Sequence, residues 1–380
     1  MRIGVLKEHA PSEHRVAMSP TVATRFIKLG VEVTVEQGAG LLAGFKDEAY
    51  ASQKADVGDR GKIIEQSDVI LAVRPPAPDT IAGIKLGTKL IGGLAPFADH
   101  TRIASYASLG IEALALELLP RITRAQSMDI LSSQANLAGY HAVVRAASEL
   151  NRCFPMMTTA AGSIPAAKAF VMGVGVAGLQ AIATARRLGA IVSATDVRPE
   201  VREQIQSLGA KPIFENVREG DEITKAEGGY AGEMSSAYLE RQAALISEHI
   251  AAQDIVVTTA LIPGRPAPRL ISDSQVATMK AGSVIVDLAA ENGGNVEGVV
   301  AGEAILRHGV IIIGLVDGAS RIAADASNLF ARNCYNFLEA FWDKGAQALA
   351  LRADDPLVEA VTLTRGGQIV HPRFAEPQVA

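Results

Sequence analysis

The chain has 380 residues, of which 48% are hydrophobic and 20% are charged, and its formal net charge is −5. This length favours two domains, and the composition is typical of a folded globular protein rather than a disordered one. The negative net charge gives no reason to expect nucleic acid or an anionic membrane surface as a partner.

The sequence has few features that direct a protein to a membrane, an export route or a metal. No apolar run approaches the roughly 18 residues of a transmembrane helix, so we expect no direct membrane span. No basic segment followed by an apolar one opens the chain, so we expect no secretory signal. Neither the cysteines, Cys153 and Cys334, nor the seven histidines have metal-like spacing. We therefore predict no metal site, and reduced thiols in a cytosolic protein.

The first third of the chain alternates short apolar runs with helical stretches. Such alternation predicts a parallel sheet with helices on both faces. The loop after the first run, residues 7–15, is charged and contains no glycine, so we do not expect it to hold a pyrophosphate closely. The helical stretches include Thr21–Leu29 and Ile81–Lys85. The expected strands are Ile3–Leu6, Val31–Val35, Val69–Val73, Leu90–Leu94 and Ala113–Glu117.

A polar segment, Pro120–Gln134, follows these strands and precedes a long helical stretch. Its residue types alone favour a helix-entry loop in which serine and aspartate cap backbone N–H groups. We expect the helix after it to bridge two domains. The apolar residues of that helix recur at helical spacing, at Leu137, Tyr140, Val143, Val144, Ala147 and Leu150.

The stretch from Lys168 to Arg198 has the pattern of a dinucleotide-binding unit. Its apolar run Ala169–Met172 predicts a buried parallel strand, and glycines at 173, 175 and 178 follow at G-x-G-x-x-G spacing. The first glycine permits a tight turn, the second lets the backbone approach a pyrophosphate, and the third lets the helix Leu179–Leu188 pack closely on the strand. The start of that helix attracts phosphate through its unpaired N–H groups and its dipole.

An acid, Asp196, lies at the tip of the next predicted strand, where it can accept hydrogen bonds from ribose hydroxyls. A carboxylate there repels the extra phosphate of NADP, which favours NAD. Arg198 weakens this inference, since a nearby arginine can accept a phosphate. We favour a solvated side chain at the strand end for Arg198.

From Ala169 onward, six apolar runs give the strand count of a doubly wound dinucleotide-binding domain. A long polar, glycine-rich interval, Asn216–Tyr238, separates two of them. We expect a mobile loop whose Tyr230 and Met234 close over a bound nucleotide; the alternative is a solvated loop without a role. The expected strands are Ala169–Met172, Ile191–Ala194, Pro212–Phe214, Ile255–Thr258, Val284–Asp287 and Val310–Gly314.

The last long helical stretch, Arg321–Phe341, follows the final strand and is expected to return to the first domain. We therefore predict an α/β fold of two Rossmann-like, doubly wound parallel-sheet domains with a cleft between them. The N-terminal domain is expected to be discontinuous, comprising residues 1–135 plus 320–380. The NAD(H)-binding domain is expected to comprise residues 136–319.

Several of these segments resemble one family. Lys7-Glu8 with Arg15-Val16-Ala17 and Pro20 resembles the opening shared by alanine dehydrogenases and proton-translocating NAD(P) transhydrogenases. Four further segments are similar to the transhydrogenase version, in its soluble NAD(H)-binding alpha subunit. They are residues 121–134, 173–178, 228–231 and 258–264.

The resemblance, which extends over essentially the whole chain, implies an activity and a setting. Hydride would pass between NADH and NADP⁺ held by a partner subunit, and a membrane-embedded partner would couple this transfer to proton translocation. The resemblance also implies a homodimer, located in the cytoplasm and peripheral to the inner membrane through its partners. A non-catalytic NAD sensor remains an alternative.

The resemblance further implies roles for single residues. Arg121, Gln126, Asp129 and Ser132 would orient the nicotinamide and meet the second nucleotide. For Leu261, plain core packing is an equal alternative. The residues implied to contact NAD(H) are Gly173, Gly175, Val176, Ala177, Gly178, Asp196, Val197, Arg198, Gly229, Tyr230, Gln242 and Leu261.

Two departures separate the chain from alanine dehydrogenases. Those enzymes carry a lysine after the third strand and a histidine after the fourth, whereas this chain has Ala72-Val73-Arg74-Pro75 and Ile91-Gly92-Gly93-Leu94. Reductive amination needs groups that polarise a carbonyl and move protons, so the departures argue against an alanine dehydrogenase-like oxidoreductase, the alternative activity. For Arg15, which resembles a carboxylate-binding residue of those enzymes, we favour a structural ion pair.

Overall fold

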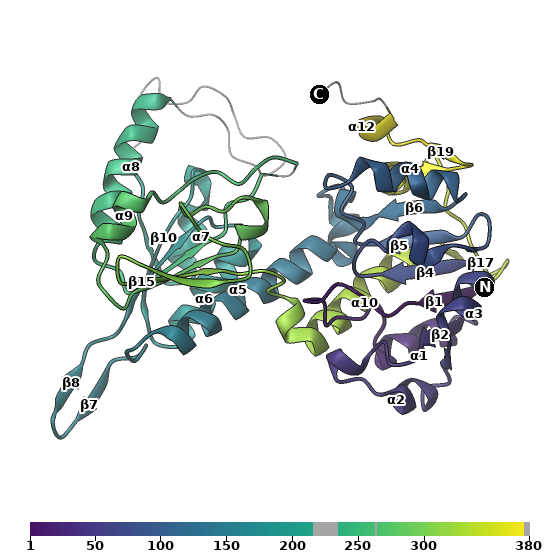
Figure 1. Cartoon of the computed structure of the whole chain (residues 1–380), viewed down its shortest axis with the longest axis horizontal. Coiled ribbons are helices and arrows are strands. Elements are labelled where there is room, and N and C mark those ends of the chain that lie inside the picture. Colours follow the sequence, from purple (N-terminus) through teal and green to yellow (C-terminus); the bar gives the residue numbers. More distant parts are fainter. Residues whose placement is uncertain (216–234, 263, 376–380) are drawn as a thin grey trace. The chain divides into compact units, whose positions relative to one another are not determined.

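The computed structural model describes residues 1–215, 235–262 and 264–375. The chain forms two compact units: Met1–Gln134 with Ala319–Ala380, and Ala135–Gly318. The first unit therefore contains both ends of the sequence. Figure 1 shows a central sheet flanked by helices in each unit.

The first unit is built on a six-stranded parallel sheet in the order β3-β2-β1-β4-β5-β6. This is the doubly wound order, in which the strand sequence reverses between β1 and β4. The strands are β1 (Arg2–Val5), β2 (Glu32–Glu36), β3 (Asp56–Gly58), β4 (Val69–Ala72), β5 (Lys89–Gly92) and β6 (Glu112–Ala115). The helices are α1 (Pro20–Lys28), α2 (Asp47–Ala51), α3 (Arg60–Gln66), α4 (His100–Ser108), α10 (Ala323–Ala340), α11 (Pro356–Val361) and α12 (Pro372–Ala375).

Both faces of this sheet are buried because successive side chains of a strand point to opposite sides. In β4, Val69 and Leu71 enter one core, whereas Ile70 and Ala72 enter another. Residues of α1, α2, α10 and α11 complete the first core, and residues of α3, α4 and α12 complete the second. Two short antiparallel pairs follow α10: β16 (Trp342–Asp343) with β17 (Ala348–Leu349), and β18 (Thr364–Arg365) with β19 (Gln368–Ile369).

The second unit has a seven-stranded sheet in the order β11-β10-β9-β12-β13-β15-β14. All its pairings are parallel except that of β14 with β15. The strands are β9 (Lys168–Met172), β10 (Ile191–Thr195), β11 (Lys211–Pro212), β12 (Ile255–Thr258), β13 (Val284–Asp287), β14 (Ala304–Arg307) and β15 (Val310–Gly314). The helices are α5 (Ile130–Glu149), α6 (Val176–Arg187), α7 (Arg202–Ser207), α8 (Ser236–Ile250) and α9 (Asp273–Thr278).

The same alternation of side chains divides this sheet between two cores. Ala169 and Val171 of β9 pack with residues of α5, α6 and α7, whereas Phe170 and Met172 pack with residues of α8 and α9. An antiparallel hairpin, β7 (Met157–Thr159) with β8 (Gly162–Ile164), extends away from the sheet of this unit (Figure 1).

The fold class is confirmed, with local differences. The expected helix Ile81–Lys85 is wrong: only a 3₁₀ turn, Pro78–Ile81, forms there. Strands β3 and β14 were not expected. Each lies at an edge of its sheet, and neither presents the fully buried apolar run by which interior strands are recognised.

Candidate functional site

The turn between β9 and α6 carries the three glycines, and two of them are required by the protein itself. Gly173 has φ 96°, which favours glycine, and a Cβ added there would lie 2.7 Å from Thr259 Oγ1. A Cβ on Gly178 would lie 1.9 Å from the carbonyl oxygen of Gly173. Both positions are therefore glycine because the turn and the helix approach each other closely.

Gly175 has no such internal reason to be glycine. Its φ is −77°, which any residue adopts, and a Cβ added there would meet no atom within 4 Å. It is the N-cap of α6, and its position provides no side-chain cap for the backbone N–H groups of the first turn, which begins with Val176 and Ala177. A helix start of this kind, uncapped and without a side chain in front of it, fits a phosphate group.

Helix α5 supports this turn through a glycine that the motif does not include. A Cβ on Gly139 would lie 2.1 Å from the carbonyl oxygen of Ala177. Gly139 thus allows α5 to touch the first turn of α6. Sequence reasoning missed this residue, although a glycine inside a long helix, which costs roughly 1 kcal/mol relative to alanine, was the available signal.

Asp196 lies just beyond β10, as expected, and is held by the glycine turn. Its Oδ2 accepts a hydrogen bond of 2.6 Å from the backbone N–H of Val174. The backbone N–H of Arg198 donates to Oδ1 at 2.9 Å. These contacts fix the carboxylate at the carboxyl edge of the sheet.

The expectation of a solvated Arg198 is wrong. Its Nε donates to Oδ1 of Asp196 at 2.9 Å and its Nη2 to Oδ2 at 3.1 Å, and only 20% of its side chain is exposed. The hydrogen bond to Asp196 raises the pKa of Arg198 further above its usual value. The two-residue spacing across the bend after β10 brings the guanidinium back onto the carboxylate.

The other proposed cofactor residues of this unit differ in exposure. Val197 and Leu261 are 40% and 47% exposed, so the core alternative for Leu261 does not hold. Gln242 is buried: its Nε2 donates to Thr195 Oγ1 at 2.9 Å, and its Oε1 accepts from the Glu215 N–H at 2.7 Å. Gln242 therefore fixes the chain at Glu215 to the end of β10. Gly229, Tyr230 and Met234 lie outside the described residues.

In the first unit, the segment 121–132 contains a 3₁₀ turn, Thr123–Met128, in which Gln126 is exposed. Asp129 precedes α5, and its carboxylate accepts hydrogen bonds from the N–H and Oγ of Ser132 at 2.9 and 2.5 Å. This is the capping arrangement that the residue types favour. Arg121 is also exposed.

Helix α10 holds that turn. Asn333 and Asn336, one helical turn apart, both donate from their side-chain amides to the carbonyl oxygen of Ser127, at 2.9 and 2.8 Å. The position of Gln126 thus depends on a helix some 200 residues further along the chain. No sequence motif signalled these two asparagines.

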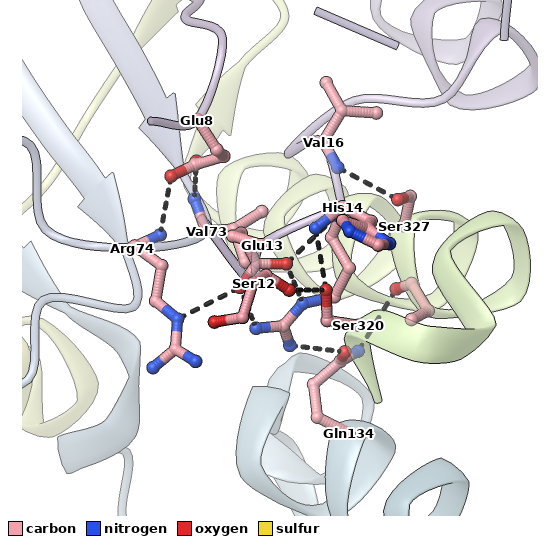
Figure 2. A network of polar contacts seen from close by, with 12 residues as sticks. Glu8, Ser12, Glu13, His14, Val16, Val73, Arg74, Gln134, Ser320 and Ser327 are labelled. Carbon is pink, nitrogen blue, oxygen red and sulfur yellow. Dashed lines mark hydrogen bonds and ion pairs between the residues drawn. The ribbon is translucent and has the colours of Figure 1, made fainter. Parts of the chain in front are cut away.

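The carboxyl edge of the first sheet is filled by a network of charges (Figure 2). The Glu13 side chain is fully buried between Arg15, at 2.5 Å, and Arg74, at 3.0 Å. Arg15 also donates to Gln134 Oε1 at 2.8 Å. Although burial alone would raise the pKa of Glu13, the hydrogen bonds and charges of these arginines hold it below its usual value. Arg15 is thus a structural ion pair, the interpretation we favoured.

Two more acids lie at this edge. The Glu8 carboxylate accepts from the backbone N–H groups of Val73 and Arg74, at 2.7 and 3.3 Å. Glu117 accepts from the N–H of Ala95 at 2.7 Å. Burial raises the pKa of each to about 7. None of these loops offers an open helix start like that of α6.

Two absences hold for the described part of the chain alone. Among residues 1–215, 235–262 and 264–375, no group of histidine, cysteine, aspartate or glutamate side chains is arranged to hold a metal ion. Within those same ranges, no helix has both the length and the apolar character that crossing a membrane would require.

The fold and the site together define a two-unit α/β protein of the dinucleotide-binding type. Sequence models of the alanine dehydrogenase/PNT family match it, the N-terminal domain over residues 4–138 and the C-terminal domain over residues 142–372. The first portion of NAD(P) transhydrogenase subunit alpha from Rhodospirillum rubrum, a separate chain, is 47% identical over 378 residues, which cover 98% of each chain. The structure of transhydrogenase from Sinorhizobium meliloti superimposes with a TM-score of 0.89 at 51% identity, covering 97% of this chain and 100% of that one.

Alanine dehydrogenases are more distant. That of Bacillus subtilis is 28% identical over 300 residues, covering 78% of this chain and 72% of its own. The chain therefore belongs to the alanine dehydrogenase/PNT family and, within it, to the NAD(P) transhydrogenase alpha subunits. The family resemblance expected from the sequence is confirmed.

Proposed function

We propose that the second unit binds NAD(H) with its pyrophosphate over Gly175 and the start of α6. The supporting observation is the open space at Gly175, a glycine that the protein's own packing does not need. Backbone N–H groups of Val176, Ala177 and Gly178 would face the phosphates. Asp196 would accept from the adenosine ribose, with Val197 and Leu261 as exposed apolar contacts nearby in the same site.

The remaining cofactor residues of this unit have indirect or separate roles in the proposal. Gln242 acts by anchoring Glu215, because both ends of its amide are already engaged. Gly229 and Tyr230 stay proposed nucleotide contacts.

We propose that this chain is the NAD(H)-binding component of a proton-translocating transhydrogenase. The bound nicotinamide supplies the hydride, and the acceptor is NADP⁺ on a partner subunit. Transfer between two nicotinamides exchanges no proton at the reacting carbons, so the protein's contribution is placement rather than acid or base catalysis. Arg74 at the end of β4 supports this interpretation, since it is paired with Glu13 where an alanine dehydrogenase would have a lysine.

Arg121, Gln126, Asp129 and Ser132 are the residues to which we assign that placement. The contact of Ser132 with Asp129 and the hold of α10 on Ser127 support a fixed geometry for this segment. A Gln126→Asn variant should lose far more hydride transfer than NADH affinity. Equal losses would mean that Gln126 only binds the first cofactor.

We further propose that the chain acts as a homodimer on the cytoplasmic side of the inner membrane. It would be peripheral there, attached through a membrane-embedded subunit that couples hydride transfer to proton translocation. The Rhodospirillum rubrum relative is named as only a portion of one subunit, which supports partners of this kind.

The test is a titration of the purified chain with NADH, comparing wild type with Gly175→Ala. We expect binding by the wild type, and a loss of at least about tenfold in affinity in the variant, without loss of stability, because the added methyl enters only the phosphate space. Failure of the wild type to bind NADH would refute the proposed function.

The transfer reaction is tested separately, by adding the partner subunits and following reduction of an NAD analogue by NADPH. We expect this reaction to depend on the partners. Its absence, with NADH binding intact, would favour a non-catalytic sensor. Robust reduction of NAD with L-alanine by the isolated chain would instead indicate an alanine dehydrogenase.

A further inference from the structure

The hydrogen-bonding positions of Asp196 are already filled. A carboxylate offers about four acceptor positions, and four donors occupy them here. Oδ1 accepts from the backbone N–H and Nε of Arg198, both at 2.9 Å. Oδ2 accepts from the Val174 N–H at 2.6 Å and from Nη2 of Arg198 at 3.1 Å. A ribose hydroxyl that donates to this carboxylate must therefore displace one of these donors.

The four donors differ in how easily they can leave. The N–H of Val174 belongs to the glycine turn, where Val174 is only 1% exposed. The N–H of Arg198 is backbone two residues from the acid, within the same bend. The guanidinium is held only by its side chain, through Nε and Nη2, with one further contact of 3.3 Å to the Val174 carbonyl oxygen. Its departure frees two acceptor positions, as many as the two hydroxyls of an adenosine ribose need.

We infer that the Arg198 guanidinium is a resident competitor of the adenosine ribose, which must leave Asp196 when NAD(H) binds, and that its charge sets how strongly the site rejects a 2′-phosphate. This inference rests on the proposed NAD(H) site. It makes Arg198 a specificity-determining residue rather than a simple cofactor contact.

The two effects have different physical origins. Displacement of a two-pronged ion pair costs free energy, so Arg198 lowers the affinity for NADH. Asp196 alone would repel the additional phosphate of NADPH, which carries between one and two negative charges. A neighbouring guanidinium offsets that repulsion, although Glu200, whose charge also acts on Arg198, reduces the offset. Arg198 therefore weakens the preference for NADH over NADPH.

The experiment measures dissociation constants of NADH and NADPH by calorimetry for the full chain and three variants. Arg198→Ala removes both the fork and the charge. Arg198→Lys keeps the charge but loses the fork. Arg187→Ala, an exposed residue at the end of α6, removes one positive charge from the same unit and is the control.

We expect Arg198→Ala to bind NADH as tightly as wild type or up to about fivefold tighter, and to bind NADPH about tenfold more weakly. Arg198→Lys should share the effect on NADH but keep the wild-type discrimination against NADPH. The control should leave the ratio of the two constants unchanged.

Weaker NADH binding in both Arg198 variants would overturn the inference, because it would make the guanidinium a supporting contact. An unchanged ratio in Arg198→Ala would overturn it as well. In either case NADH binding by the wild type would leave the proposed function standing. A wild type that does not bind NADH would refute both.

Discussion

The two units have the same doubly wound strand order but opposite carboxyl edges. In the first, the edge is filled by the buried Glu13 with Arg15 and Arg74, and by backbone N–H groups that donate to Glu8 and Glu117. In the second, the glycine turn leaves the start of α6 uncapped and open. The topology supplies a place for a ligand in both units. Whether a phosphate can use it depends on a few side chains, or on their absence.

The largest expected effect concerns the glycine that the second unit needs for packing. Gly178→Ala places a methyl 1.9 Å from a backbone oxygen, so we expect a loss of at least about 3 kcal/mol in the free energy of unfolding. Gly175→Ala, three residues away, is the matched control, since nothing lies within 4 Å of its added Cβ. Chemical denaturation of both variants makes the measurement, and similar losses in the two would contradict the distinction.

Breaking the charge network of the first unit should have the next largest effect. Glu13→Gln leaves two arginines without their carboxylate, one of them almost fully buried. We expect a loss of about 2 kcal/mol, at the lower end for a buried pair because Arg74 is partly exposed. Denaturation of Glu13→Gln, Arg15→Met and the double variant checks this. Additive losses would mean that the two side chains do not stabilise each other.

The smallest effect is a dependence on pH. Glu8 has a pKa of about 7 in the folded protein and an ordinary value near 4.5, so the folded state binds the proton more tightly. Its contribution to stability is complete below about pH 4.5 and is lost as the pH rises through 7. Glu8→Gln should remove about 1 kcal/mol of the stability difference between pH 5 and pH 8, after allowance for partial exposure.

Denaturation midpoints of wild type and Glu8→Gln at the two pH values make this measurement, with the exposed Glu65→Gln as control. A variant as sensitive to pH as the wild type would show that Glu8 is not the titrating group. The second unit supplies no acid at its glycine turn for a comparable test, among the residues that the structure describes, other than Asp196.

The sequence predicted what depends on neighbours along the chain. Apolar runs located the interior strands, and Val310–Gly314 formed with the expected bounds. The position of Asp196 followed from the strand–turn–helix pattern. The pairing of Arg198 with Asp196 could not be predicted, because it depends on the bend after β10 rather than on residue type.

Contacts between distant segments were also beyond the sequence. Gln242 looked like a nucleotide contact, yet its amide joins Glu215 to Thr195. Glu13 gave no sign that its charge would be shared by Arg15 and Arg74, since Arg74 is some 60 residues away. Such pairings depend on which strand ends meet at one edge, and a single sequence contains no record of that.

The two asparagines of α10 that grip Ser127 have a consequence for the order in which the protein is made. The 3₁₀ turn that carries Gln126 is synthesised early, but the helix that seats it leaves the ribosome about 200 residues later. By then every strand of the second sheet has already been translated. The first unit to begin is thus the last to be finished, and a nascent chain halted before α10 would carry a Gln126 with nothing to hold it in place.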